Sequence, residues 1–441
     1  MAEIAVVVGV VALAGLHVLY VLGARHFSVL SQMLATYVAV FLCLGLIGIA
    51  DLSMLLGYFV VYLLAVMAAW GIVKVNVGLL RGCSGAMILF YLLLVCGAFY
   101  GESEDVLSAL KWKVIGFLTI VAGISVSRTS TDLHHFRKGM RLLIAPLGVG
   151  AALLLLAVIR SGGVARLDIL GNPNTGGIIS ASSFCLALYL ALWDNSRTVR
   201  IWAIAIAVAL GFAVLATGSR SAAVAAVVAG WILAAPLMKR PSRLLGATLA
   251  SMIVIWVLLG GLGGINLDEA LARLLQFDVD TGRQAYWADL IEESRGHWLF
   301  GVGTHLDLES EGRVQWANMH SIYIQVFYES GLCGSLAFAL SILYVAWKST
   351  RLFFHCTVPE KWLAYALIAL PMSIGLFESA PLLGISFASV WWGMGLGLLD
   401  QLATPEFGKD AGLNGMLARG VSVQSLRPAC ATFQQNREGQ R

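Results

Sequence analysis

The chain has 441 residues, of which 59% are hydrophobic and only 12% are charged. Soluble proteins carry roughly 25% charged residues, so this composition excludes an ordinary soluble domain. Apolar runs of about 17–25 residues recur along the chain, and each is long enough to cross the hydrocarbon of a bilayer. The composition therefore predicts an all-α polytopic integral membrane protein. We assign the net charge of +4 to the loops between spans and predict no nucleic-acid partner.

The apolar runs predict about 13 transmembrane helices, within a range of about 12–14. Residues 1–402 form the membrane domain in this prediction. The tail, 403–441, has little apolar content and is predicted to be disordered. In chain order, the predicted spans are 4–24, 30–50, 53–73, 83–100, 111–127, 139–159, 175–193, 199–217, 219–238, 243–262, 319–347, 361–380 and 382–402.

The distribution of Lys and Arg predicts the orientation. One set of loops holds 15 of these residues, whereas the short loops of the other set hold three to five. The positive-inside rule makes the first set and the tail cytoplasmic. The long acidic loop 263–318, with four Arg against ten Asp and Glu, then lies outside, in the periplasm of a Gram-negative cell.

The external loop is predicted to be partly helical. A helix is expected from near Thr281 to about Glu293, with Ala285, Ala288 and Ile291 on one side and Tyr286 and Leu290 beside them. Arg283 would lie in its first turn, where free N–H groups and the helix macrodipole favour an anion. This position makes Arg283 a candidate anion-binding residue.

Seven cysteines are scattered through the chain, mostly inside apolar runs. They lack the close spacing of a zinc site or a redox motif, so we interpret them as small packing residues. We predict neither a metal nor a cofactor.

Arg220 lies in the short break Thr217–Ser221 between two apolar runs. One interpretation is an arginine that anchors a helix end at the interface. The other is a guanidinium that grips a phosphate in bidentate fashion, with Ser219 and Ser221 keeping the turn small.

His320 ends the acidic loop and is expected to open the next span. Tyr323, Gly331 and Gly334 would share its helix face, with Glu329 opposite, so the imidazole would point into the bundle. Histidine with a pKa of about 6.5 accepts protons near neutral pH, although a structural hydrogen-bonded role is also open.

A further external loop runs from Arg166 to Gly177 and contains the turn signal Asn172–Asn174. Asn174 is expected to cap the following span, or to present its amide to a sugar. Arg166 adds an external cation on the same side.

These motifs resemble, in order and spacing, those of the O-antigen ligase/polymerase family over about residues 165–340. One departure is Ser321, where the family usually has Asn. The motifs are Gly-Asn-Pro-Asn at 171–174, Thr-Gly-Ser-Arg-Ser-Ala at 217–222, Gly-Arg-Gln-Ala-Tyr-Trp at 282–287, Phe-Gly-Val-Gly-Thr at 300–304, His320, and Glu-Ser-Gly at 329–331 with Gly334.

The resemblance implies a GT-C-like architecture and a metal-independent inverting glycosyltransferase of the cell inner membrane. Such an enzyme transfers a glycan from undecaprenyl pyrophosphate to an acceptor hydroxyl at the periplasmic face. His320 would act on the acceptor hydroxyl, while Arg220 and Arg283 would neutralise the leaving pyrophosphate. The substrate-binding candidates are Arg166, Asn174, Ser219, Ser221, Ser321 and Tyr323.

Within the family, transfer onto lipid A-core or a similar terminal acceptor is favoured slightly over repeat-unit polymerisation for lipopolysaccharide or exopolysaccharide. A protein acceptor is also open. A transporter of lipid-linked oligosaccharides and a non-catalytic membrane scaffold are the alternatives from other classes. A transporter is expected to place charged groups at mid-membrane depth, whereas here the candidates gather at one face.

Overall fold

The computed structural model describes residues 82–97, 99, 106–128, 133–160, 173–239, 283–303, 320–356, 358–378 and 387–404. Within these ranges the regular elements are all helices, and none is a strand. The predicted spans 4–24, 30–50, 53–73 and 243–262 lie outside the described residues, as does the tail beyond residue 404.

The described helices follow the predicted spans closely. The predicted spans 175–193 and 199–217 correspond to α8 and α9, and 139–159 corresponds to two consecutive helices, α6 and α7. The elements are α4 (Gly82–Gly97), α5 (Val106–Arg128), α6 (Leu133–Leu142), α7 (Ile144–Arg160), α8 (Pro173–Trp193), α9 (Arg197–Ala216), α10 (Arg220–Ala234), the 3₁₀ helix η2 (Ala235–Lys239), α13 (Arg283–Glu293), the 3₁₀ helix η3 (Ser294–Gly296), α14 (Ile322–His355), α15 (Glu360–Gly375) and α16 (Phe387–Leu402).

Five described helical segments are long and apolar enough to cross a membrane, by length and composition. Each has 18 or more residues, and α4 adds a shorter apolar helix. The segments are Leu133–Leu155, Asn174–Trp193, Arg197–Ala216, Arg220–Leu237 and Ile322–Phe354.

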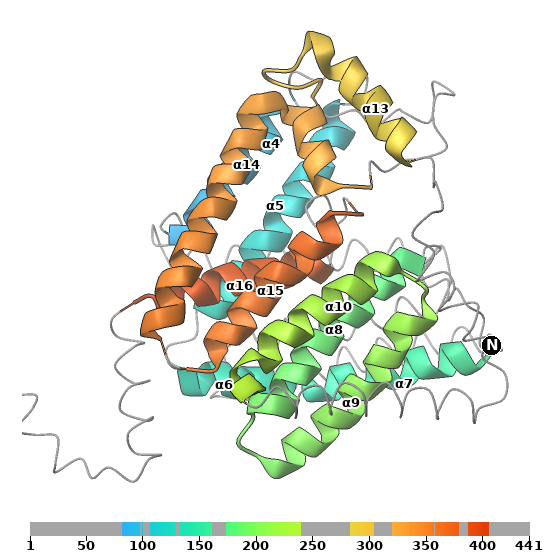
Figure 1. Cartoon of the computed structure of the whole chain (residues 1–441), viewed down its shortest axis with the longest axis vertical. Helices are drawn as coiled ribbons and strands as arrows, with labels where there is room; N and C mark the ends of the chain where they lie inside the picture. The colour runs from blue at the N-terminus through green and yellow to red at the C-terminus, as the bar shows by residue number, and fades with distance from the viewer. Residues whose placement is uncertain are drawn as a thin grey trace, which may run out of the picture.

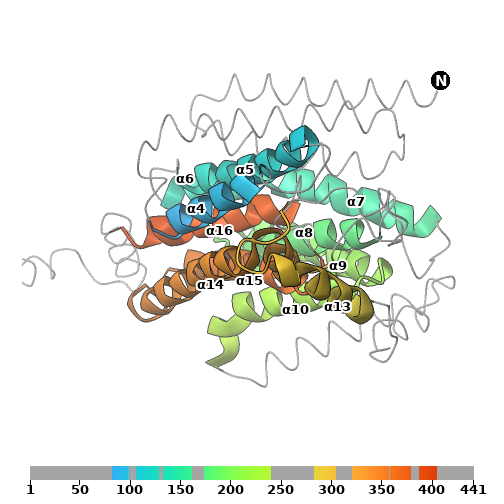
Figure 2. The ribbon, with the colours of Figure 1, turned by 90° about the horizontal axis from the view of Figure 1, so that it is seen from above.

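Helices α5, α16, α15 and α10 pack side by side in that order. Helix α16 packs against α5 on one side and α15 on the other, and α15 packs against α10 (Figure 2). Small residues allow the α5–α16 contact, since a Cβ at Gly123 would lie 2.0 Å from the Val390 carbonyl oxygen. Close approach at such residues is how membrane helices associate.

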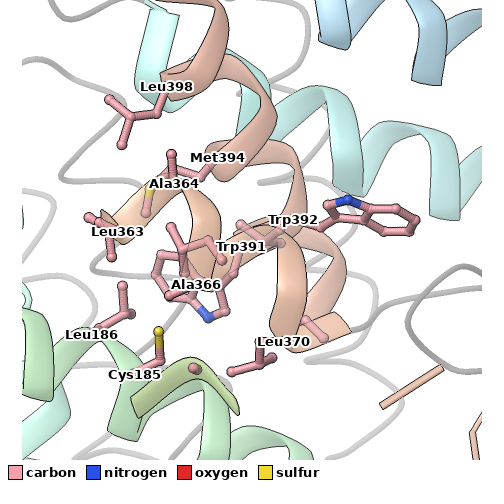
Figure 3. Close-up of a cluster of buried hydrophobic side chains, with 14 of the residues drawn as sticks. Cys185, Leu186, Leu363, Ala364, Ala366, Leu370, Trp391, Trp392, Met394 and Leu398 are labelled. Carbon is pink, nitrogen blue, oxygen red and sulfur yellow. The ribbon is translucent and has the colours of Figure 1, made fainter. Parts of the chain in front are cut away.

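The centre of the bundle is a cluster of fully buried side chains. Figure 3 shows Trp391 and Trp392 of α16 together with Leu370 of α15 and Cys185 of α8, all of them 0% exposed. Because these side chains come from α8 and from two helices much later in the chain, the cluster fixes the mutual positions of α8, α15 and α16.

One end of the bundle, here called the basic end, is held by ion pairs. Arg137 Nε donates to Glu360 Oε1 over 2.5 Å, and the Tyr189 hydroxyl donates to the same oxygen over 2.9 Å. Lys348 Nζ lies 3.1 Å from Asp400 Oδ1. These contacts join α6, α8 and α15 on one side, and α14 and α16 on the other.

At the opposite end, α13 lies beside the upper end of α14 in Figure 1 and contacts that helix. Its start at Arg283 and end at Glu293 confirm the predicted helix. Of the residues in the predicted pattern, Tyr286 and Leu290 are buried, whereas Ile291 is 47% exposed. These two residues pack with Val302 and Tyr328, so contacts formed by later parts of the chain choose the buried face. Burial raises the pKa of Tyr286, which therefore stays neutral.

Candidate functional site

His320 lies at the end of the bundle opposite the basic end and is 7% exposed. Helix α14 begins two residues later, at Ile322, with Ser321 as its N-cap. The predicted helical face of His320 was therefore wrong, because the residue is not in the helix. Its φ of 51° is a left-handed conformation that non-glycine residues rarely adopt. Such strain persists where surrounding contacts impose it, and it is common at functional sites.

A buried carboxylate that the sequence analysis missed faces this histidine. Glu378 follows the end of α15 and is 3% exposed. Its Oε2 lies 3.4 Å from His320 Nδ1, and its Oε1 accepts a hydrogen bond of 2.6 Å from Asn174 Nδ2. A proton on Nδ1 would be directed toward Glu378, which leaves Nε2 with a lone pair to accept another proton.

Asn174 lies inside the first turn of α8, because that helix begins at Pro173. Proline suits this position, where the missing N–H costs no helical hydrogen bond. The capping interpretation was wrong, because Asn174 is the second residue of α8 and not the residue that precedes the helix. Its amide instead links the start of α8 to Glu378 and thus to His320.

The start of α10 packs against the start of α8. A Cβ at Gly177 would lie 2.7 Å from the Ser219 Cβ and 2.8 Å from the Ala222 Cβ, so only glycine permits this contact. The hydroxyls of Ser219 and Ser221 lie 3.1 Å apart. Arg220, between them, is half-buried and is the first residue of α10.

Three helix N-termini thus meet at one site, those of α8, α10 and α14. The N-terminus of a helix carries a partial positive charge and free N–H groups. Neither Ser219 nor Ser321 caps its helix with its side chain. The arrangement favours an anion beside an imidazole.

The remaining sequence candidates are placed as follows. Ser321 is buried, and Tyr323 is 36% exposed with its hydroxyl donating to the Met372 carbonyl over 3.3 Å. Arg283 begins α13, which confirms its predicted position in the first turn, although its side chain lies outside the described part. Arg166 also lies outside the described residues.

Two further buried charges escaped the sequence analysis. Lys113 of α5 and Glu329 of α14 form an ion pair, with side chains 3% and 5% exposed. Lys113 lies near the start of the predicted span 111–127, and Glu329 was predicted on the helix face opposite His320. Glu378 was placed inside a predicted span. For Lys113, Glu329 and Glu378 the sequence offered the same signal, a charged residue within an apolar run. Placing a charge there costs free energy, so such residues usually have a partner or a function.

No group of three or more His, Cys, Asp or Glu side chains in the described ranges is arranged to hold a metal ion. The polar groups at the site are instead an imidazole, a carboxylate, an amide, hydroxyls and a guanidinium. This donor set is suited to proton transfer and to anion binding.

The fold and this site define a multi-pass helical membrane protein with a polar, partly cationic site at one end of its bundle. Residues 205–339 match the family model described as O-antigen ligase. The matched part runs from α9 into α14 and contains Arg220, Arg283 and His320. The match confirms the resemblance to the O-antigen ligase/polymerase family, whose members are ligases or polymerases of surface polysaccharide biosynthesis. No curated protein shows a significant match to the chain.

Proposed function

We propose that this protein transfers a glycan from an undecaprenyl-pyrophosphate donor to an acceptor hydroxyl at the periplasmic face of the inner membrane. The observation that carries the proposal is the contact of His320 with Glu378 beside the N-termini of α8 and α10. A proton acceptor and an anion-binding region thereby lie side by side.

The proposed chemistry is an inverting displacement. His320 Nε2 takes the proton of the acceptor hydroxyl as its oxygen attacks the anomeric carbon. The bond from that carbon to the pyrophosphate oxygen breaks, and the electron pair leaves on the lipid pyrophosphate. Glu378 orients the imidazole and stabilises the imidazolium that forms.

The leaving pyrophosphate needs fixed positive charge. Arg220 at the start of α10 and Arg283 at the start of α13 supply guanidinium groups, and the helix N-termini add partial charge. Ser219, Ser221 and Ser321 lie at the same helix starts and contribute hydroxyls. Preorganised groups of this kind act where charge develops in the transition state.

The placement at the outer face is supported by the opposite end of the bundle. Arg137 and Arg141 of α6, Lys348 of α14 and Lys361 of α15 lie there. The positive-inside rule assigns such an end to the cytoplasm, which leaves the His320 end outside.

The first experiment compares site variants with matched controls in the native strain. His320→Ala and Arg220→Ala are expected to insert normally and to lower glycan product by about 100-fold, the cost of losing one transition-state contact. His297→Ala and Arg295→Ala, at exposed positions after α13, serve as controls and should keep wild-type product. Wild-type product from both site variants would reject the catalytic role.

The second experiment separates a ligase from a polymerase by a gel of surface glycans from a deletion strain. Full-length polymer held on carrier lipid, with bare lipid A-core, supports the ligase that we favour. Loss of polymer with single repeat units still attached supports the polymerase, because then only chain growth is missing.

A further inference from the structure

Helix α14 is divided in two by a bend at Gly331, visible at its upper end in Figure 1. Gly331 has φ 60° and ψ −155°, which ends the regular helix after Ser330. The part after the bend has about 24 residues and is long enough, at about 36 Å, to cross a bilayer. The part before it, Ile322–Ser330, is a short helix with His320 just before its start. We call it the short helix.

The end of the short helix is held by the segment Trp298–Gly303. Val302 and Gly303 N–H groups donate to the carbonyls of Tyr328 and Glu329 over 2.8 and 3.1 Å. Beyond the bend, Leu332 and Cys333 N–H groups donate to the carbonyls of Trp298 and Leu299 over 2.7 and 3.0 Å. The bend exposes these backbone groups, and the segment satisfies all four.

The start of the short helix is held against α15. His320 faces Glu378, and a Cβ at Gly375 would lie 2.3 Å from the Ile322 side chain. Each end of the short helix is therefore held in place by a neighbouring segment. All of these contacts come from α15 and from Trp298–Gly303, and none of them comes from the side of the short helix that faces α5.

A third contact lies on the side of the short helix. The Glu329 carboxylate pairs with Lys113 of α5 and accepts a hydrogen bond of 2.7 Å from Gln325 Nε2. A buried ion pair is weak support for stability, because two charges lose their water and apolar residues of equal size pack as well. The ion pair does favour one orientation of the short helix relative to α5, because only in that orientation does the Glu329 carboxylate reach the Lys113 ammonium. A rigid helix carries that orientation to its other end.

We propose that Lys113 and Glu329 are positioning residues for His320, which set the rotation of the short helix so that the imidazole meets Glu378 and the acceptor hydroxyl. This inference rests on the proposed function. A shift of about 1 Å at a catalytic group costs on the order of 100-fold in rate, so a loosened side contact has a measurable effect.

The test uses full-length protein in nanodiscs, with the lipid-linked glycan fraction from a deletion strain as donor and that strain's lipid extract as acceptor. The variant Lys113→Met/Glu329→Leu removes both charges and keeps the volume. It is expected to remain monodisperse with a near-wild-type unfolding temperature, while kcat per folded molecule falls at least about tenfold and KM for the donor stays within about twofold. Wild-type kcat per folded molecule overturns the proposal.

Two further variants keep the result decisive. Should the double variant fail to fold, the isosteric Glu329→Gln is measured, where a lowered kcat per folded molecule supports the proposal and an unchanged one overturns it. Lys348→Met is the matched control, since it breaks the ion pair of the other part of α14 and should leave kcat unchanged. A His320→Ala protein with wild-type transfer would instead reject the proposed function.

Discussion

Replacing Gly331 by alanine tests how the bend of α14 supports the site. The added methyl group would lie 2.5 Å from the Gly301 nitrogen and 2.6 Å from the Leu299 carbonyl carbon and the Trp298 carbonyl oxygen. All three are backbone atoms, so no side chain can move aside. Gly331 has φ 60° and ψ −155°, a region almost restricted to glycine, which costs an alanine a further ~1–3 kcal/mol.

The protein can relieve this overlap by releasing the segment Trp298–Gly303. Release breaks four backbone hydrogen bonds, each worth about 1 kcal/mol net, or about 4 kcal/mol together. The destabilisation is local, because none of the four hydrogen bonds involves α8, α15 or α16, which form the core of the bundle. We therefore expect the Gly331→Ala protein to insert in the membrane and to keep its helical bundle. The short helix should no longer be held in one position, and the rate of glycan transfer should fall by about 100-fold.

The assay combines a surface-glycan gel with limited trypsin digestion at Arg295, an exposed residue just before the segment. The variant should give little product and faster cleavage at Arg295. Gly296→Ala is the matched control, because a Cβ there meets nothing within 4 Å, and it should match the wild type in both measurements. Wild-type product and digestion from Gly331→Ala would refute the reasoning.

Three other substitutions test separate contacts. Glu378→Ala removes the partner of His320 and should lower transfer by about 100-fold at an unchanged folded yield, measured as kcat per folded molecule. Gly177→Val places carbon atoms within 2.7 Å of the start of α10, so product on the surface-glycan gel should fall although the protein still inserts. Arg137→Ala leaves the Glu360 carboxylate, 0% exposed, without its cation, which should cost about 3 kcal/mol of unfolding free energy in thermal melts and leave kcat per folded molecule unchanged.

Much of the helical framework was predictable from the sequence. The apolar runs predicted the ends of α8 and α9 to within about two residues. This was possible because the thickness of the bilayer sets the length of an apolar span, and that length can be read from one continuous stretch of sequence. The helix from Arg283 to Glu293 was also predictable from local pattern. The candidate residues Arg220, Asn174 and His320 stood out as polar groups at the ends of apolar runs.

The partners of these residues were not predictable. Periodicity placed His320 on a helix face, but the positive φ of His320 and the bend at Gly331 depend on contacts with Glu378 and Trp298–Gly303. Likewise, the helical pattern did not show which side of α13 is buried, because Val302 and Tyr328, which cover Tyr286 and Leu290, lie elsewhere in the chain.

Composition and apolar run length predict a multi-pass helical protein and show where charged residues interrupt its apolar runs. Which of those charges meet depends on how the helices pack against one another. Glu378 faces His320 across 58 positions, and Glu329 pairs with Lys113 across 216. Hydrophobic length is a property of one segment, whereas these side-chain hydrogen bonds and ion pairs join different segments, so the second kind of information appears only once the bundle has formed.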